Sequence, residues 1–439
     1  MTIRMDEGAA ELLDTLHRVG YAAYVVGGCV RDSLLGLTPH DWDLCTSALP
    51  QQVMELFGAQ RCIPTGLQHG TVTVKQSGAL YEITTFRTEG TYTDGRHPDE
   101  VHFVPDVRKD LARRDLTINA MAYNEKEGLV DPFGGQADLQ SGIVRAVGVP
   151  RQRFTEDALR ILRLYRFAAR FGFAIDPPTA QAAQELCAHL DCVSVERIEE
   201  ELVKLLSAPA PAAYLDKKIL LVILPELSSE ALAAAKPVVD ACPAGAENLP
   251  IRLAALLYSL GEDGTRRTLR RLRCSNALIE EAAVLVREAR GCDGSFSEDR
   301  PLGWDPVAEG NRAGDGMARI VSEEKATVTP DFTIYARRLL GKYNLCTVQR
   351  LAALGTALQP ERSADFAALS ELAEQLDADG VCCRVSQLAV NGRDLMAAGV
   401  PAGPGIRKVL EALLDGVIRE EYPNERQALL AAVQRLAAS

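Results

Sequence analysis

Strand-forming patterns are confined to the first third of the chain, and this asymmetry limits the fold more than any other feature. Before about residue 145, apolar or alternating runs such as YAAYVVGG and TVTVKQSGALYEITTFR are separated by turn residues and helical stretches. From Phe154 onward, strand patterns fade, and Leu, Ala, Glu and Arg recur with helical periodicity. Because 439 residues exceed one ordinary core, we expect a region of helices and strands followed by several helical domains.

Local patterns predict the elements of the N-terminal region. An amphipathic helix is expected within residues 1–16, and the Ser-Gly pair inside 71–87 predicts a β-hairpin. The polar segment 87–105 contains Gly and Pro and is typical of a mobile loop. The other predictions are strands at 21–28, 40–47 and 143–148, helices at 30–36 and 47–58 and one opening at 113–124, a turn at 131–142, and later helix breaks near 177–178, 209–211, 242–250, 291–306 and 400–405.

Composition indicates a globular protein without a membrane segment. Apolar residues make up 47% and charged residues 25% of the chain, and no run approaches the ~18 consecutive apolar residues of a spanning helix. The N-terminus carries early acids and does not resemble a signal peptide, so we expect a cytoplasmic protein. The 11 cysteines are scattered without a C-x-x-C pair, which argues against a disulfide scaffold or structural zinc. A net charge of −12 argues weakly against a large nucleic-acid surface, although a basic patch acts locally.

The stretch YVVGGCVRDSLLGLTPHDWDLCTS, residues 24–47, indicates a site for phosphates. Gly27 and Gly28 end a predicted strand, and without a Cβ the backbone there can approach a bulky anion. The start of the next helix offers unpaired N–H groups, and Arg31 adds a planar fork of donors for phosphate oxygens. These residues therefore predict a phosphate-binding cradle that differs from the P-loop pattern.

Two acids in the same stretch indicate a metal site. Asp41 and Asp43 are two apart on the strand predicted at 40–47, so both carboxylates would share one face. Carboxylates together with substrate phosphates suit Mg²⁺, which can stabilise the attacking and leaving oxygens of an in-line displacement. Glu82, in the predicted hairpin, is a candidate third acid. A lone D-x-D or G-G is usually a turn or a solvated strand edge, so the joint arrangement carries the prediction.

GGCVRD followed by DWD resembles the nucleotidyltransferases of the polymerase-β superfamily. RRDLTINAMAY, DPFGGQADL, EDALRILRLYRFAARFGF and ERIEEELVKLL then follow in order, and the set is similar to bacterial class II tRNA nucleotidyltransferases (CCA-adding enzymes) and related poly(A) polymerases. The resemblance is dense over residues 20–206 and resumes near the C-terminus. It implies an α+β polymerase-β-like head with a mixed sheet, residues 1–150, and an all-α remainder divided into a neck, 151–206, a degenerate HD-like body, 207–345, and a tRNA-binding tail, 346–439.

The resemblance also implies roles for individual residues. Gly27, Gly28 and Arg31 would hold the triphosphate. Asp41 and Asp43 would bind Mg²⁺, and Glu82 would help to activate the primer hydroxyl. Arg114, Asp115 and Asn119 would contact the phosphates and ribose of the nucleotide. Asp115 and Asn119 are four apart, which would place them on one helical face, where an acceptor and an amide can recognise the 2′-OH.

The segment EDALRILRLYRFAAR predicts how a base could be chosen without a template. Its bland interpretation is an amphipathic helix with an ion pair between Asp157 and Arg160. The functional interpretation is that Asp157 accepts from an exocyclic amino group while Arg160 donates to base acceptors. Cytosine and adenine carry that amino group, whereas uracil and guanine present a carbonyl, so an acceptor there rejects U and G. Arg163 and Arg166 would add phosphate or base contacts.

RNA binding is expected mainly from the helical region. Seven arginines between 145 and 170, including Arg170, form one basic cluster, and RRTLRRLR, 266–273, forms a second that includes Arg270 and Arg271. Each run could be a solvated face, but together they are plausible phosphate contacts to a tRNA acceptor arm. The loop at 87–103 resembles the flexible loop of full CCA-adding enzymes and favours CCA over CC-only addition.

One departure from related enzymes concerns the body. Where some relatives have an LLHDIGK-like segment of the HD class, this chain reads LAALLYSLGEDG, with Tyr258 and Ser259 in place of His and Asp. None of the 6 histidines lies beyond His189, so a His-ligated metal centre in 210–439 is excluded and 2′,3′-phosphatase activity is not expected.

The leading hypothesis is Mg²⁺-dependent addition of C, C and A to tRNA from CTP and ATP, with release of pyrophosphate. The alternatives are a poly(A) polymerase or a CC- or A-adding enzyme, although the C-terminus ALLAAVQRLAAS lacks a basic extension. A catalytically dead RNA-binding protein would need a broken D-x-D or R-R-D, and a small-molecule nucleotidyltransferase would not need the long helical tail. The sequence leaves the oligomeric state open, including a homodimer, and indicates no protein partner.

Overall fold

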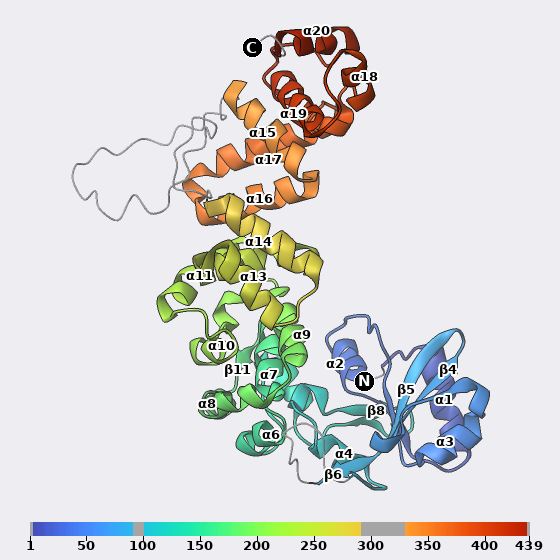
Figure 1. Cartoon of the computed structure of the whole chain (residues 1–439). Coiled ribbons are helices and arrows are strands. Elements are labelled where there is room, and N and C mark those ends of the chain that lie inside the picture. Colours follow the sequence, from blue (N-terminus) through green and yellow to red (C-terminus); the bar gives the residue numbers. More distant parts are fainter. Residues whose placement is uncertain (1–2, 91–100, 291–329, 437–439) are drawn as a thin grey trace, which may run out of the picture. The chain divides into compact units, whose positions relative to one another are not determined.

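The computed structural model describes residues 3–90, 101–290 and 330–436 (Figure 1). These residues form two compact units. The first comprises residues up to Ser229 together with Arg271–Arg273, and the second comprises Glu230–Arg270 and the residues from Cys274 onward. The finer boundaries at 150, 206 and 345 remain predictions.

A seven-stranded mixed sheet forms the N-terminal part of the first unit, which confirms the predicted head. Its strand order is β3-β4-β5-β2-β1-β8-β9, and β2 and β5 are parallel neighbours while the other pairs are antiparallel. The strands are β1 (Ala23–Val26), β2 (Leu44–Thr46), β3 (Cys62–Gly66), β4 (Thr71–Gln76), β5 (Ala79–Thr85), β8 (Ala122–Asn124) and β9 (Gly128–Val130). The interior strand β1 is buried along its whole length, so both faces of the sheet need cover.

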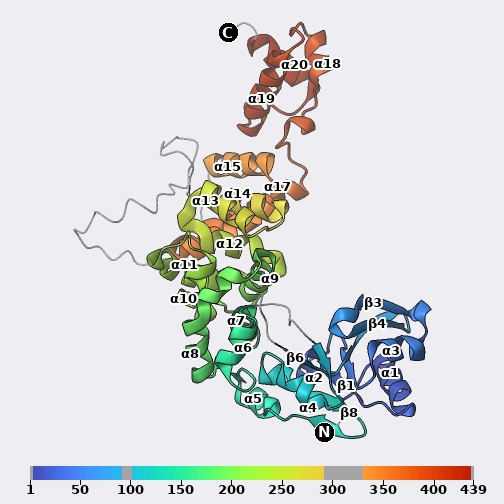
Figure 2. The same cartoon turned by 60° about the horizontal axis from the view of Figure 1, so that its bottom comes forward.

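Helices cover both faces of the sheet. Successive side chains of a strand point to opposite faces, so each face presents its own apolar residues to a helix. Tyr24 and Val26 of β1 pack in a core that includes Leu111 of α4 (Val107–Ala112). On the other side lie α1 (Glu7–Arg18) and α3 (Pro50–Phe57), which Figures 1 and 2 show along the sheet near β4. The amphipathic helix predicted in 1–16 is thereby confirmed, and the Asp6 carboxylate caps it by accepting from the Ala9 N–H.

The β4–β5 hairpin is confirmed. Its register pairs Gln76 with Ala79, and Ser77 and Gly78 have φ angles of 49° and 85°, the conformation of a tight two-residue turn. The expected loop after it is shorter than predicted, because β6 (Arg87–Glu89) pairs with β7 (Val101–Phe103). Residues 91–100, the middle of that predicted loop, lie outside the described residues.

Two predictions in the head are wrong. No helix opens at 113–124 in the structure, because α4 ends at Ala112 and is followed by a single 3₁₀ turn, Thr117–Asn119, and then β8. The Asp115 carboxylate accepts from the N–H of Leu116, and such a local bond competes with helix formation. The turn predicted at 131–142 contains a helix, α5 (Gly135–Ser141), since Asp131 accepts from the N–H groups of Gly135 and Gln136 and so starts it.

Helices dominate the rest of the described chain, as predicted. The first unit continues with α6 (Pro150–Glu156), α7 (Leu159–Phe171), α8 (Pro177–Leu186), α9 (Val195–Leu206) and α10 (Lys217–Ile223), with the short parallel pair β10 (Ile143–Val144) and β11 (Ala174–Ile175) between head and helices. Prolines begin α6 and α8, where the missing N–H costs nothing.

The second unit contains a series of helices, with α11 (Ser229–Ala241) beginning at the unit boundary. The others are α12 (Leu249–Leu257), α13 (Gly261–Arg271), α14 (Asn276–Arg290), α15 (Pro330–Lys342), α16 (Leu345–Leu358), α17 (Ser363–Ala378), α18 (Gly392–Ala397), α19 (Pro404–Ile418) and α20 (Arg426–Leu436). The last three share a small apolar core that includes Leu395, Leu413 and Leu429. The predicted break at 209–211 falls between helices, those at 242–250 and 400–405 extend two residues into α12 and α19, and that at 177–178 coincides with the start of α8. The predicted break at 291–306 lies outside the described residues. Across the ranges that the structure describes, none of the helices has both the length and the apolar character needed to traverse a bilayer.

Candidate active site

The glycine turn after β1 is closed tightly by the rest of the head. Gly27 has φ 77° and ψ −119°, a conformation that strains other residues, and its N–H donates to the Met121 carbonyl at 3.0 Å. A Cβ on Gly27 would lie 2.9 Å from a guanidinium nitrogen of Arg114. The structure therefore brings Arg114 of the R-R-D segment against the predicted cradle, which only glycine permits.

Arg31 lies beneath this turn and is 4% exposed. Its guanidinium donates to Asp32 at 2.8 Å and to the Asn119 side-chain oxygen at 2.5 Å. It also lies over the ring of Phe167, 5.0 Å from the centroid. Burial lowers the pKa of Arg31, while Asp32 opposes that shift. Arg31 thus joins the head to α7, and its predicted phosphate contact stays a prediction.

The two acids of D-x-D lie just before β2, so the prediction that they belong to the strand is wrong by a few residues. The pairing nevertheless extends to them, because the Val26 N–H donates to the Asp43 carbonyl at 2.9 Å. The parallel register Leu44–Ile83 places Asp43 beside Glu82 on the neighbouring strand. Asp43 and Glu82 are thereby placed side by side at the start of β2, and Asp41, two residues earlier, is close enough for its charge to act on Asp43.

These carboxylates repel one another. Partial loss of water raises the pKa of Asp43, and the charges of Glu82 and Asp41 raise it further, while Arg114 opposes the shift. Neither Asp41, Asp43 nor Glu82 forms an ion pair with another described residue. A cation beside these three carboxylates would reduce their mutual repulsion.

The acids Asp41 and Asp43 suit a metal ion whose remaining ligands come from the substrate. Within residues 3–90, 101–290 and 330–436, no three His, Cys, Asp or Glu side chains are grouped closely enough to hold a metal on their own. Mg²⁺ does not require such a group, because one or two carboxylates plus substrate phosphates and water suffice. Two hard carboxylates beside a glycine turn meet that requirement.

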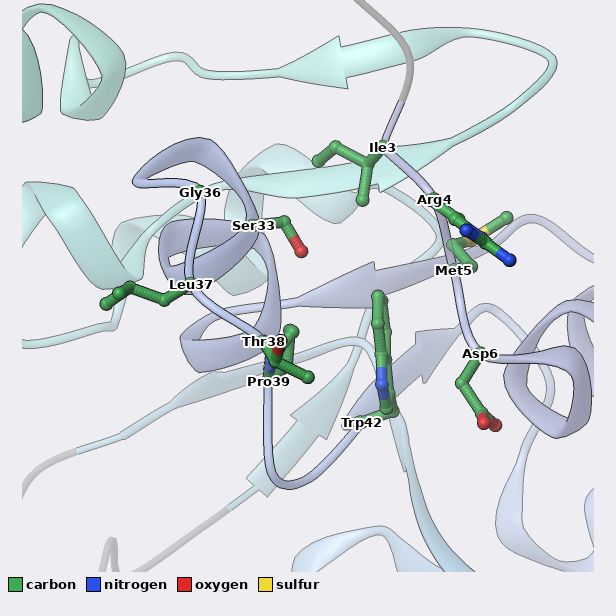
Figure 3. Close-up of a pocket in the computed structure, with 10 residues that line it drawn as sticks. All are labelled: Ile3, Arg4, Met5, Asp6, Ser33, Gly36, Leu37, Thr38, Pro39 and Trp42. Carbon is green, nitrogen blue, oxygen red and sulfur yellow. The ribbon is translucent and has the colours of Figure 1, made fainter.

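Trp42, between the two acids, lines a cavity. Figure 3 shows its indole directed into a cavity of about 530 Å³ between residues 3–6 and the end of α2 (Gly28–Leu34) with the following loop. Ile3, Met5 and Leu37 provide apolar walls there. Successive side chains of an extended segment point to opposite sides, so anchoring Trp42 directs both aspartates away from this cavity.

The R-R-D segment connects the head to α7 through ion pairs. Asp115 is 8% exposed and accepts from the Asn119 amide at 3.3 Å and from Arg163 Nε at 2.7 Å. Burial alone would raise the pKa of Asp115, but the guanidinium of Arg163 holds it well below its usual range. Asp115 and Asn119 therefore meet as predicted, although a 3₁₀ turn and not a helical face brings them together.

Asp157 and Arg160 lie at the junction of two helices and not on one helix. Asp157 is extended, with φ −147° and ψ 105°, between α6 and α7. Its oxygens accept from the Leu159 N–H at 3.1 Å and from Arg197 at 2.7 Å. Arg160 donates to Glu156 at 2.7 Å and to the Arg113 carbonyl at 3.1 Å. The bland interpretation, an Asp157–Arg160 ion pair, is absent here, since each residue has another partner.

Sequence reasoning missed the acid that organises the arginines of α7. Glu201 of α9 is 5% exposed, and its carboxylate lies 3.8 Å from Arg163 and pairs with Arg166. Its neighbours on the same buried helix face are Ile198, Leu202 and Leu205. An acid at an apolar position of an amphipathic helix was the available signal, because such a charge requires a buried partner.

The predicted RNA contacts have different surroundings. Arg170 lies 3.3 Å from Asp32 and over the Phe171 ring. Arg271 pairs with Glu226 at 2.6 Å and also donates to a backbone carbonyl, while Arg270 is exposed on α13. Arg170 and Arg271 thus have partners within the protein, and RNA contact by these three residues stays a prediction.

The segment that departs from the HD pattern forms a closed turn. Tyr258 and Ser259 follow α12, and Arg290 donates to their backbone carbonyls at 3.0 and 3.1 Å. A guanidinium there is consistent with a structural role for this turn.

The buried ion pair of Asp115 gives a stability prediction. Replacing Arg163 with Met keeps the apolar stem but leaves the carboxylate uncompensated, which should lower the free energy of unfolding by about 2–3 kcal/mol. The matched variant Arg151→Met breaks an exposed pair with Glu185 and should change it by less than about 0.5 kcal/mol. Urea unfolding at neutral pH measures both.

The same pair predicts a pH dependence. Because the folded-state pKa of Asp115 is lowered, its contribution is present above the unfolded pKa of about 3.9 and is lost as pH falls toward the folded value. The difference in free energy of unfolding between wild type and Arg163→Met should therefore become smaller in acid. A difference that stays constant from pH 7 to the lowest pH at which both proteins fold would contradict the assignment.

Comparisons with known proteins agree with this arrangement. Residues 23–145 match the family model of the poly A polymerase head domain, 172–230 that of an RNA and SrmB binding site of polymerase A, and 322–433 that of tRNA nucleotidyltransferase domain 2. The CCA-adding enzyme of Levilactobacillus brevis is 34% identical over 97% of both chains, and that of Geobacillus stearothermophilus is 34% identical over 96% of this chain and 95% of that protein.

Solved structures show the same fold. The Bacillus stearothermophilus CCA-adding enzyme in complex with CTP matches with a TM-score of 0.77 at 30% identity, covering 99% of this chain and 98% of that one. The Thermotoga maritima CCA-adding enzyme complexed with tRNA_CCA matches with a TM-score of 0.62 at 20% identity, covering 99% of this chain and 97% of that one, a likeness of fold alone.

Proposed function

The chain belongs to the family of CCA-adding enzymes, and from that premise we propose how its residues add C, C and A to the 3′ end of tRNA from CTP and ATP. The observation that carries the proposal is the placement of Asp43 beside Glu82, with Asp41 two residues earlier, near a glycine turn that Arg114 closes. Acids that repel one another next to a glycine turn and an arginine suit a metal-bound triphosphate.

The reaction is nucleotidyl transfer. The primer 3′-oxygen forms a bond to the α-phosphorus, the bond from that phosphorus to the β-phosphate bridging oxygen breaks, and pyrophosphate leaves with its electron pair. Nucleotidyltransferases of this family use a divalent metal ion, and we propose that Asp41 and Asp43 hold Mg²⁺, which when bound lowers the charge barrier between the two anions. Glu82 lies beside Asp43 and accepts the hydroxyl proton in this scheme.

Arginines and an amide hold the rest of the nucleotide. Arg114, beside the Gly27–Gly28 turn, binds the triphosphate, and Arg31 braces that turn from beneath. Asp115 and Asn119 face the ribose and favour a 2′-hydroxyl, which can both donate and accept. Their positions depend on Arg163, so α7 and the head must stay in register for binding.

Asp157 and Arg160 select the base. Each Asp157 oxygen accepts one protein donor and retains a second lone pair, which can accept from an exocyclic amino group of cytosine or adenine. Arg160 is held by Glu156 and the Arg113 carbonyl, so its remaining donors are fixed for a ring nitrogen or carbonyl. We propose that the acceptors of Asp157 and the donors of Arg160 replace the base edge of a nucleic-acid template. Arg166 and Arg163 add further contacts.

The helical region binds the tRNA, and Arg170, Arg270 and Arg271 are proposed backbone contacts. Shape and phosphate recognition suit this task, because A-form helices expose mainly backbone and 2′-OH groups. A cytoplasmic location is part of the same proposal.

A transfer assay tests the proposal against a small-molecule nucleotidyltransferase and against an RNA-binding protein without activity. Purified protein, Mg²⁺ and each labelled nucleotide are mixed with tRNA lacking CCA or with small hydroxyl acceptors. We expect CMP and AMP transfer to tRNA, stoichiometric pyrophosphate, and no transfer from UTP or GTP. Label on small acceptors, or tight tRNA binding without transfer, would overturn the proposal.

A further inference from the structure

Asp110 of α4 is a buried carboxylate to which the mechanism above gives no role. The residue is 0% exposed. One carboxylate oxygen accepts from Arg113 Nε at 2.9 Å and from the backbone N–H of Arg87 at 3.3 Å. Arg87 is the first residue of β6, so this oxygen ties the end of α4 to the strand pair that flanks the predicted loop.

The other oxygen faces the arginine that closes the glycine turn. Asp110 Oδ2 lies 3.6 Å from a terminal nitrogen of Arg114, and this oxygen has no hydrogen-bond partner among the described residues. Arg114 Nε is likewise buried without a hydrogen-bond partner within the described chain. The other terminal nitrogen of Arg114 lies 3.5 Å from the Asn119 carbonyl oxygen and adjoins Gly27. One guanidinium therefore extends from a buried negative charge to the cradle.

This geometry holds Arg114 by charge without a close hydrogen bond between its terminal nitrogen and Asp110. A buried carboxylate needs a nearby cation. The Arg114 guanidinium is close enough to Asp110 for charge attraction, but 3.6 Å is too long for a good hydrogen bond. Phosphate oxygens are strong acceptors for guanidinium donors.

We propose that Asp110 is a positioning residue that sets Arg114 for the triphosphate of the incoming nucleotide. The proposal rests on the function above and adds to it a residue that touches no substrate. Because every nucleotide carries the same triphosphate, losing this carboxylate should weaken CTP and ATP alike and should leave tRNA binding unchanged.

Three variants test this role. Asp110→Asn keeps the shape and can keep the acceptor for Arg113 and Arg87, but it turns an amide donor toward Arg114, so the KM of both CTP and ATP should rise about tenfold. Asp106→Asn is the matched control, because Asp106 caps the same helix from an exposed position and asparagine caps as well as aspartate. Asp110→Glu keeps the charge although the side chain is larger, so its KM for CTP and ATP should lie between those of Asp110→Asn and wild type.

The rescue separates charge from packing. If Asp110 only fills the core, the isosteric Asn should be tolerated and the larger Glu should be the worse substitution, which would overturn the proposal. If Asp110→Asn does not fold, Asp110→Glu is measured with and without Arg114→Ala: a higher KM for both nucleotides that disappears in the Arg114→Ala background, with tRNA affinity within about twofold of wild type, supports the proposal. The same rise in that background, or an equal loss for tRNA, refutes it.

A double-variant cycle tests the route through Arg114. In an Arg114→Ala background, Asp110→Asn should cause little additional loss of CTP binding, measured by equilibrium titration without turnover. Independent, multiplying effects would contradict the proposal. Wild-type protein that binds no CTP in this titration would instead refute the proposed function, so the two failures are distinguishable.

Discussion

Replacing Asp41 or Asp43 with alanine should lower the single-turnover rate of nucleotide addition by at least about 10³-fold, because either change removes a ligand of the proposed metal. Affinity for tRNA should stay within about twofold of wild type, since both acids lie in the head, just before β2, and not in the helical region. Asp14→Ala, which breaks an exposed ion pair on α1, is the matched control and should retain full activity.

Replacing Asp43 should lower activity but should not lower the stability of the protein. The raised pKa of Asp43 means that its ionised form is disfavoured in the folded protein, so stability is lost as pH rises through the unfolded and then the folded pKa. At neutral pH without metal, Asp43→Asn should therefore melt at the same temperature as wild type or higher. Mg²⁺ with CTP should raise the melting temperature of wild type but not of the variant. A variant that is less stable and still responds to the metal would contradict the assigned site.

Replacing Asp157 with asparagine should reverse part of the base preference. The change puts an amide donor where an acceptor faced the amino group, so kcat/KM for CTP and ATP should fall about 10²-fold, while UTP and GTP, which present a carbonyl there, should gain relative to them. Competition between labelled nucleotides on one tRNA acceptor measures the ratio directly.

A matched control for this change lies on the neighbouring helix. Glu185→Gln removes a charge from the exposed pair between Arg151 of α6 and Glu185 of α8 and should leave the ratio unchanged. If Asp157→Asn slows all four nucleotides equally, Asp157 does not contact the base and only supports Arg197.

Alternation and turn chemistry made much of the head predictable from sequence. The Ser77-Gly78 pair predicted a hairpin that the register confirms, and the apolar run before Gly27 predicted the interior strand β1. Asp41 and Asp43 were expected within a strand, but β2 begins at Leu44, after both of them. The hairpin and the interior strand depend on neighbours in sequence, which is why a single sequence contains them.

What could not be predicted depends on partners far apart in the chain. Asp115 meets Asn119 through a 3₁₀ turn, and its carboxylate also bonds Arg163, 48 residues away. Asp157 lies outside both helices and pairs with Arg197, 40 residues away. Glu201 shows in the sequence only as an acid on an apolar helix face, and its partner Arg166 lies 35 residues away.

The central claim is that one site performs three additions and then stops, and product length tests it most directly. Transcripts of one tRNA ending before CCA, after C and after CC are incubated with Mg²⁺, CTP and ATP, and products are resolved at single-nucleotide length. The account predicts that all three converge on one sharp CCA end and that Asp41→Ala yields no extension. A stop at CC, or a long ladder of A residues, would contradict it and indicate a CC-adding enzyme or a poly(A) polymerase.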